Sequence, residues 1–278
     1  MIGAAARYPS GQVGILLAGF VVLVAAVGPL LAPHDPNVFV GSPFQSSTPQ
    51  LLFGADVLGR DVLSRVLSGG YRILFMSLCA TLLGVSGGAI LGMMAGYGGG
   101  KIDEVIMRSL DVALAFPQMI LALLLLSIMG SDAWVVIGVV AAIHMPQVAR
   151  VLRAATLGVS REDYVQHVRV IGMNRMKILF HEVLPNISAP LLIELGLRFT
   201  FSIALISALN FLGLGQQPPT ADWGLMINEN RIGLAANPWP VVVPVTLIAL
   251  LTVGINLMTD AVSRSYMDGQ GTADNARQ

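Results

Sequence analysis

Residues 73–96, which read ILFMSLCATLLGVSGGAILGMMAG, decide the fold, because they are predominantly apolar and carry no charged side chain. A helix of this length, rising about 1.5 Å per residue, crosses the roughly 30 Å hydrocarbon core of a bilayer. The alternation of a barrel strand is absent, and backbone groups in lipid must be satisfied within the segment, so a transmembrane helix is predicted. Gly88, Gly92 and Gly96 repeat at a small-xxx-small spacing, which lets a second helix approach closely; ordinary tolerance of glycine in membrane helices is the alternative interpretation.

Five further apolar blocks extend this pattern over the whole chain. Only 12% of the 278 residues are charged and 55% are hydrophobic, whereas soluble domains carry about 25% charged residues. The apolar residues come in long blocks, which argues against a soluble protein with an unusually apolar core. No repeat and no second domain is evident, so residues 1–278 are predicted to form a single, all-α, polytopic membrane domain. Its six predicted transmembrane helices are about 13–32, 73–96, 112–130, 134–152, 188–212 and 240–260.

The sequence lacks the residues that several kinds of chemistry require. The formal net charge is +0, so no bulk attraction to nucleic acid is expected. Cys79 is the single cysteine, which excludes a disulfide framework and a zinc-type cysteine cluster. No Walker-type GxxxxGK[ST] motif occurs, so the chain is not expected to bind ATP by that route. No set of nucleophile, base and orienting residue is visible, so the sequence predicts a non-catalytic chain without a cofactor or metal of its own.

The basic residues orient the chain by the positive-inside rule. The block 13–32 counts as a retained span, because it is longer than a usual signal-peptide core and no clean cleavage site closes it. With the amino terminus in the cytoplasm, eleven of the 16 Lys and Arg residues fall inside, four fall outside, and Arg198 lies within a span. Both termini are therefore predicted to be cytoplasmic, with 33–72 as a periplasmic loop. The eleven are Arg7, Lys101, Arg108, Arg150, Arg153, Arg161, Arg169, Arg175, Lys177, Arg264 and Arg277.

The predicted outer side carries two amphipathic features. In the loop 33–72, apolar and charged residues share one short stretch, which predicts a short helix lying on or against the outer membrane face. Its apolar residues are Leu58, Val62 and Val66, and its charged residues are Arg60, Asp61 and Arg65. The three tryptophans are predicted to lie near the outer interface, where aromatic belts form. They are Trp134, Trp223 and Trp239.

Residues 153–187 form the coupling loop between the fourth and fifth predicted spans and read RAATLGVSREDYVQHVRVIGMNRMKILFHEVLPNI. Ser160 followed by Asp163 resembles a capping box, and acidic residues favour a helix amino terminus. The helix predicted to start there ends at Gly172. One of its faces collects the side chains of Tyr164, Val168 and Ile171.

A second short helix is predicted after Gly172, with Asn174 as its cap and Pro185 as its stop. Its apolar stripe consists of Met176, Leu179, Phe180 and Val183. Two interpretations of this helix–Gly–helix segment remain open. It could be an amphipathic connector held at the membrane surface by its basic residues, or a rigid lever that docks into a soluble partner.

Charged and polar residues inside the predicted spans are candidates for a translocation path. Glu194 and Arg198 lie four residues apart in the fifth span and so share a helix face. Charges at such depth face the interior of a bundle and tend to be functional or paired. A polar station in the path is one interpretation; the favoured one is a structural i,i+4 salt bridge. His144 in the fourth span is a further candidate, and as a lone histidine it is a poor metal ligand.

The coupling loop resembles that of the ABC importer permeases, whose signature runs roughly E-A-A-x3-G-x9-I-x-L-P. Residues 164–172 (YVQHVRVIG) and 181–186 (HEVLPN) stand in the matching positions. Three further stretches narrow the resemblance to the C-type subunit of the dipeptide/oligopeptide family. They are 54–65 (GADVLGRDVLSR), 96–111 (GYGGGKIDEVIMRSLD), and 210–224 (NFLGLGQQPPTADWG), in which Asn210 replaces the family's serine. The resemblance runs from about residue 50 to 268.

This resemblance implies a type I ABC importer permease fold with a cytoplasmic coupling helix, in the inner membrane of a prokaryote. It implies a permease subunit that imports di- or oligopeptides by alternating access, as a non-catalytic part of an ATP-hydrolysing complex. The expected partners are a homologous B-type permease, ATPase subunits (two chains or one fused chain) that bind ATP and magnesium, an extracytoplasmic substrate-binding protein, and membrane lipid. The residues expected to contact the ATPase are Arg161, Glu162, Asp163, Tyr164, Gln166, His167, Arg169, Gly172, Met173, Asn174 and Arg175.

One departure from the family pattern is expected to affect the partner. Gln166 stands where the signature has Glu, and His167 and Val168 replace the Ala-Ala pair. Glutamine can still donate and accept hydrogen bonds, so an ATPase with an adapted groove is expected rather than lost function. Nickel, haem or another small ligand remains an alternative cargo. A secondary transporter, which would show inverted repeats, and an intramembrane enzyme, which would need convergent titratable groups, are less favoured classes.

Overall fold

The computed structural model describes residues 2–275, so residue 1 and residues 276–278, with Arg277, lie outside the described part. The predicted all-α class is confirmed, because residues 2–275 form helices and no strand. Five helices are long and apolar enough to cross a membrane. They are α2 (Pro9–Leu31), α3 (Val62–Gly98), α6 (Ala133–Val159), α10 (Ser188–Phe211) and α12 (Trp239–Asn275).

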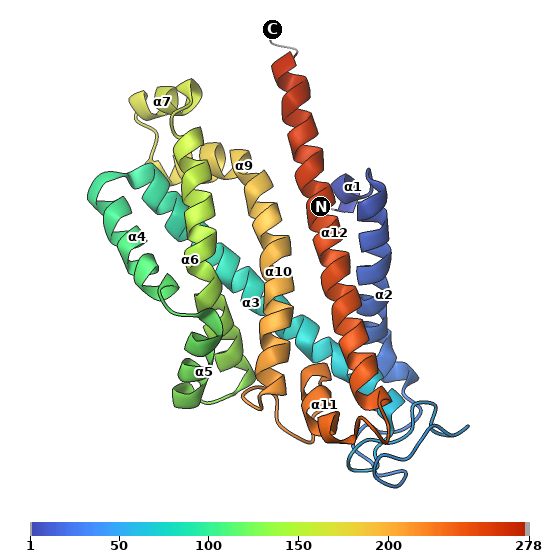
Figure 1. Cartoon of the computed structure of the whole chain (residues 1–278). Coiled ribbons are helices and arrows are strands. Elements are labelled where there is room, and N and C mark those ends of the chain that lie inside the picture. Colours follow the sequence, from blue (N-terminus) through green and yellow to red (C-terminus); the bar gives the residue numbers. More distant parts are fainter. Residues whose placement is uncertain (1, 276–278) are drawn as a thin grey trace.

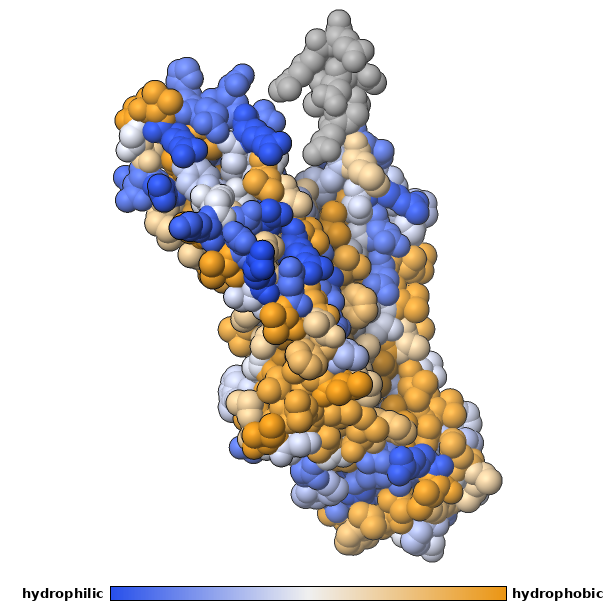
Figure 2. Space-filling view, turned by 60° about the vertical axis from the view of Figure 1, so that its left-hand side comes forward, coloured by the Kyte–Doolittle hydropathy of each residue, from blue (hydrophilic) through white to orange (hydrophobic). Residues whose placement is uncertain are grey.

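The shorter helices gather at the two ends of the bundle (Figure 1). One end carries α7 and α9 and lies on the same side as α1, and the opposite end carries α11 and the long loop before α3. In Figure 2, hydrophobic surface forms a belt between hydrophilic surface at the α7 end and a smaller hydrophilic area at the opposite end. The short helices are α1 (Ile2–Ala5), α7 (Asp163–Val170), α8 (Arg175–Lys177), the π-helix η1 (Ile178–Val183), α9 (Leu184–Asn186), α11 (Trp223–Asn230) and the 3-10 helix η2 (Arg231–Gly233).

The predicted third span, 112–130, is not one straight helix. It is divided between α4 (Gly100–Leu114) and α5 (Gln118–Met129), which are bent by 86° relative to each other. Pro117 occupies the N-cap of α5, and a proline disfavours helical backbone at the residue before it. The 12 residues of α5 reach only about 18 Å at 1.5 Å per residue. The bundle therefore has up to six spans if the bent pair is counted as one.

The helix predicted from residue 73 starts eleven residues earlier, at Val62, so the loop predicted as 33–72 ends at Asp61. Asp61 is the N-cap of α3, and its carboxylate accepts hydrogen bonds from the backbone N–H groups of Leu63 (3.3 Å) and Ser64 (3.1 Å). Val62 and Val66 are 0% and 3% exposed. The prediction of a separate surface helix here is therefore wrong, because these residues are the buried first turns of α3.

A glycine ladder joins α3 to α6 and confirms the predicted close approach. A Cβ atom added at Gly92 would lie 2.6 Å from the carbonyl oxygen of Ala149, and one at Gly96 would lie 2.8 Å from that of Arg153. Both distances are far below van der Waals contact, so only glycine permits this separation of the two backbones. The ladder is longer than predicted, since Gly84 makes the same kind of approach to α6.

The three tryptophans differ in burial. Trp223 is fully buried at the start of α11 and donates from Nε1 to the carbonyl oxygen of Val66 at 2.8 Å. Trp223 lies at the predicted end of the bundle but is not part of an exposed aromatic belt, because its indole fills the space left by Gly69 and Gly70. Trp134 and Trp239 are 71% and 41% exposed.

Candidate functional site

The coupling segment leaves the bundle at the end of α6 and returns through a continuous run of short helices. The helix α6 ends at Val159, and α7 projects at the tip of the bundle (Figure 1). Gly172 follows α7 with φ +89°, a left-handed conformation that glycine adopts without steric cost. Asn174 then caps α8 by accepting a hydrogen bond from the Met176 N–H at 3.0 Å. The predicted helix end at Gly172 and the predicted cap at Asn174 therefore agree with the structure.

Two details of the predicted segment are wrong. Glu162, not Ser160, is the N-cap of α7, and its side chain makes no capping hydrogen bond. The buried Ser160 hydroxyl has no partner among the described residues; instead, Gln166 donates from Nε2 to the Ser160 carbonyl oxygen at 2.6 Å. Pro185 does not stop the second helix, because it occupies the first turn of α9, where a missing backbone N–H costs nothing.

The first coupling helix is anchored to the bundle by its inner face. Val165 is fully buried, and it belongs to an apolar cluster with Ile178 and Val183 of η1. The same cluster contains Val85, Ala89 and Met93 of α3 and Val148 and Leu152 of α6. The predicted stripe is partly wrong, since Tyr164 and Ile171 are 41% and 78% exposed. Because α7 packs on η1 and this cluster continues into α3 and α6, α7 is joined to the bundle through η1.

Apolar side chains are presented to solvent at the tip of this segment. Val170, Ile171 and Met176 are 87%, 78% and 57% exposed, and we call them the docking face. Large exposed apolar side chains with a polar surround are typical of a protein interface. All of the residues predicted to contact an ATPase lie exposed around this face: Arg161, Glu162, Asp163, Tyr164, Gln166, His167, Arg169, Gly172, Met173, Asn174 and Arg175.

The surroundings of α7 keep the Tyr164 hydroxyl protonated. Partial burial, reinforced by the carboxylates of Glu162 and Glu182, raises the pKa of the Tyr164 hydroxyl above its usual value. The guanidinium of Arg169 lies 5.9 Å from the centre of the Tyr97 ring, within the range of a cation–π contact. This contact ties α7 to the end of α3.

The path candidates occupy one buried seam between α6 and α10. Arg198 donates from Nε to Glu194 at 2.8 Å and from its terminal nitrogen to the amide oxygen of Gln147. One turn further along, His144 Nε2 lies 3.0 Å from the Ser202 hydroxyl. Glu194, Arg198 and His144 are 5%, 9% and 1% exposed. Glu194, Arg198 and His144 Nε2 find partners within the chain, which favours the structural interpretation, whereas His144 Nδ1 has no partner among the described residues.

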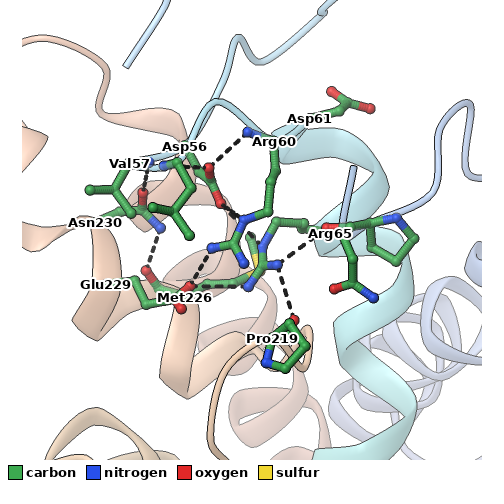
Figure 3. Close-up of polar contacts among 12 residues, drawn as sticks. Asp56, Val57, Arg60, Asp61, Arg65, Pro219, Met226, Glu229 and Asn230 are labelled. Atoms are coloured by element: carbon green, nitrogen blue, oxygen red, sulfur yellow. Dashed lines mark hydrogen bonds and ion pairs between the residues drawn. The ribbon is translucent and has the colours of Figure 1, made fainter. Parts of the chain in front are cut away.

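A buried charge cluster joins the outer loop to α11 and α3 (Figure 3). The guanidinium groups of Arg60 and Arg65 lie between two carboxylates, those of Asp56 and Glu229. Arg60 donates to Asp56 at 2.7 Å, and both arginines contact Glu229 at 3.0 Å. Asn230 accepts a hydrogen bond from the Val57 N–H at 2.8 Å. We call these five residues, with Val57, the outer clamp.

The outer clamp was not predicted from the sequence. Asp56, Arg60 and Arg65 stand in a recognisable motif, but Glu229 lies more than 160 residues away along the chain. The seam shows the same effect, since its partners Gln147 and Ser202 are neutral residues within spans. Two arginines close together on a short apolar stretch indicate that carboxylates must lie nearby in the fold. The sequence does not show which carboxylates these are.

No group of three or more His, Cys, Asp or Glu side chains suited to a metal ion occurs among the described residues. His144 and the acidic residues of the outer clamp lie in separate parts of the structure and share no contact. The geometry of the chain therefore offers a docking face at one end, a buried seam within the bundle, and a clamped loop at the other end.

Comparisons with known proteins match almost the whole chain. The family model of the binding-protein-dependent transport system inner membrane component matches residues 88–268. A di/tripeptide transport system permease protein of Pseudomonas aeruginosa is 34% identical, over 90% of this chain and 84% of the relative. A dipeptide transport system permease protein of Haemophilus influenzae is 31% identical, over 90% and 87%. A glutathione transport system permease protein of Pectobacterium atrosepticum is 34% identical, over 92% and 87%.

Proposed function

Because the chain belongs to the inner-membrane components of binding-protein-dependent transport systems, we propose that it is one permease subunit of an ATP-driven importer of di- and oligopeptides. It forms half of a translocation pathway and changes the access of that pathway between the two sides of the membrane. The observation that carries the proposal is the match to peptide permeases over 90% of the chain. Nickel or haem as cargo is not favoured, since the relatives carry peptide and glutathione names.

The docking face is the contact proposed for the ATPase. ATP and Mg²⁺ are bound by the ATPase subunits, and their closure moves α7 as a body. The apolar tip at Val170 and Ile171 enters a groove of the ATPase, and the surrounding charges orient it. Gln166, His167 and Val168 stand where the family has Glu-Ala-Ala, so the groove of the cognate ATPase is adapted to bulkier side chains.

The remaining partners follow from the two ends of the bundle. A homologous B-type permease completes the pathway, and a soluble peptide receptor docks at the end that carries the outer clamp. The docking face is cytoplasmic, and both termini lie on that side of the bacterial inner membrane. The excess of basic residues at this end supports the orientation.

An uptake assay tests the proposal. Cells that lack this gene are expected to lose uptake of radiolabelled dipeptides, and the wild-type gene on a plasmid restores it. Unlabelled peptides of two to five residues are expected to compete, whereas nickel salts and haem are not. A deletion strain that takes up every peptide at the wild-type rate, with other peptide importers deleted in the background, would contradict the proposal.

A further inference from the structure

A small pocket opens at the outer end of the bundle, apart from the outer clamp and the seam. Its volume is about 260 Å³, below the roughly 300–1,000 Å³ of a site for a whole drug-sized ligand. It lies where the early turns of α3 meet the start of α6. The lining residues are Tyr71, Arg72, Phe75, Met76, Ala133, Trp134, Ile137 and Gln216.

The single cation of the pocket is Arg72, which lacks a carboxylate partner among the described side chains. It is half-buried, and its contacts are a 3.4 Å hydrogen bond to the Gln216 amide oxygen and the Tyr71 ring, whose centre lies 5.7 Å away. The buried Asp222 influences it electrostatically without an ion-pair contact. By contrast, Arg60 and Arg65 are each paired with two carboxylates. A guanidinium has five N–H donors, so most of those of Arg72 remain available.

The start of α6 faces the same pocket through Ala133 and Trp134. No side chain caps this helix, although Asp132 stands at the N-cap position. Asp132 is exposed and does not line the pocket. The unsatisfied N–H groups and the dipole of a long helix favour an anion at this end. A guanidinium and a helix amino terminus therefore converge on one small volume.

The other walls of the pocket are apolar. Phe75 and Trp134 pack edge to face with ring centres 6.3 Å apart, and Met76 and Ile137 are 3% and 2% exposed. An anion held here would lie against aromatic and aliphatic surface. This chemistry fits a carboxylate attached to an apolar side chain, as in the last residue of a peptide.

We propose that the Arg72 pocket binds the C-terminal residue of a peptide substrate, with its α-carboxylate on Arg72 and its side chain against Phe75 and Trp134. This inference deepens the proposed function and rests on it. Gln216 is a positioning residue: its backbone N–H donates to Asn210 at 2.9 Å, and its amide oxygen holds Arg72. The small volume restricts the contact to one residue, so peptides of different length can share the site.

Quenching of Trp134 tests the site directly. The full chain, in nanodiscs of phosphatidylcholine, is titrated with alanyl-4-nitrophenylalanine and with its C-terminal amide, since the nitrophenyl group quenches tryptophan fluorescence. Wild type is expected to bind the acid at least about tenfold more tightly than the amide, the scale of one charge-assisted hydrogen bond. Arg72→Gln is expected to erase this preference while binding the amide unchanged, and Trp134→Phe to remove the part of the quenching that comes from the pocket.

Arg231→Gln is the matched control, because Arg231 also lies over an aromatic ring, that of Phe211, at the outer end but outside the pocket. It is expected to keep the preference for the acid. Equal binding of acid and amide by wild type, or a preference that survives in Arg72→Gln, would overturn the inference. Loss of peptide binding when phosphatidylglycerol replaces part of the phosphatidylcholine would identify a lipid phosphate as the ligand and overturn it as well.

Uptake separates this inference from the proposed function. If wild type imports peptides, Arg72→Gln is expected to raise the KM for peptide acids at least about tenfold, whereas Arg231→Gln does not. Unchanged KM in Arg72→Gln would refute the pocket and leave the importer standing. Absence of peptide uptake by wild type would refute the importer instead.

Discussion

At the scale of single residues, the distance between α3 and α6 is set by glycine. Gly84, Gly88, Gly92 and Gly96 place backbone against backbone, and an added Cβ at any of them would lie within 3.0 Å of a carbonyl oxygen of α6. Lipid offers little hydrophobic drive for helix association, so close packing of this kind supplies the attraction. The α6 helix carries the coupling segment at its end, and the glycines make it one rigid unit with α3.

Replacing Gly92 by leucine is expected to destabilise this unit. The added side chain meets the Ala149 carbonyl oxygen and the Arg153 N–H, so the helices must separate at a cost of about 1–3 kcal/mol or more. Gly138→Leu, on the exposed side of α6 where nothing lies within 4 Å, is the matched control. Thermal unfolding in detergent measures both variants. Equal midpoints would show that the close approach is not needed.

Asp222 is a buried acid whose charge is only partly satisfied. One carboxylate oxygen accepts hydrogen bonds from Asn210 (2.8 Å), Gly224 (2.9 Å) and Leu225 (3.1 Å). The other oxygen has no partner among the described residues. Burial raises the pKa of this carboxyl, against the opposing effect of those hydrogen bonds. The protonated form therefore stabilises the fold. This stabilisation is fully present below the unfolded pKa of about 3.9 and is lost as the pH rises through the folded pKa.

Asp222→Asn is expected to raise the unfolding temperature at pH 7.5, because the amide keeps the capping oxygen and removes the buried charge. A gain of 1 kcal/mol corresponds to about 2–4 °C in a chain of this size. The difference from wild type should shrink as the pH falls toward 4, where the wild-type carboxyl is protonated. Unfolding curves from pH 4 to 8 measure it, and a constant difference across this range would refute the assignment.

At the scale of elements, the coupling segment combines an anchored helix with one tight turn. The helix α7 is fixed by Val165, while Gly172 turns the chain in the left-handed region with nothing within 4 Å of its Cβ position. Beyond the turn, α8, η1 and α9 run directly into α10. The π-helix η1 has the irregular hydrogen bonding that often marks functional sites. A push on α7 therefore reaches α10 through the turn at 171–174 and the short helices that follow it.

Gly172→Val is expected to uncouple ATP hydrolysis from uptake while leaving the bundle folded. The open space around Gly172 removes any steric clash, so the cost of about 1–2 kcal/mol comes from its left-handed backbone alone and falls on the turn. Gly158→Ala, in the last turn of α6 and equally open, should leave coupling intact. Peptide uptake per ATP hydrolysed, in proteoliposomes with the ATPase and receptor, is the measurement. Unchanged coupling in Gly172→Val would refute the lever.

At the scale of the whole molecule, the outer clamp fixes the loop before α3 to a distant part of the chain. The loop contributes Asp56 and Arg60, α3 contributes Arg65, and α11 contributes Glu229 (Figure 3). Arg65 also donates to the carbonyl oxygens of Pro36 and Pro219. The loop is therefore held as a rigid surface, as a platform for a docking receptor requires.

Glu229→Gln is expected to loosen this platform, because two buried guanidiniums then share one carboxylate. Removing one partner of a buried pair costs about 3–5 kcal/mol at full burial, and somewhat less here because Glu229 is 11% exposed. Hydrogen exchange in residues 33–61 should accelerate. Glu104→Gln is the control, since its pair with Arg108 is exposed at 60% and 79% and worth little. Equal exchange in both variants would show that the clamp does not order the loop.

The apolar blocks predicted the helices well because lipid leaves the backbone no other choice. The helix end at Gly172 and the cap at Asn174 were also predictable, since both depend on local backbone geometry. The errors share a different origin. The start of α3 at Val62 and the burial of Trp223 depend on what packs against each segment. The unused cap at Ser160 shows the same dependence, because α7 is placed by the burial of Val165.

The sequence by itself determined the membrane class, the number of apolar blocks, the position of the coupling segment and the family to which the chain belongs. These properties follow from composition and local pattern, which act over one or two helical turns. Only the tertiary structure decided that Glu229 completes the outer clamp, that Ser202 and Gln147 pair with His144 and Arg198, and that Arg72 meets the start of α6. Each of these contacts joins residues far apart in the chain. No local propensity selects such a partner, so the close packing of the helices decides it.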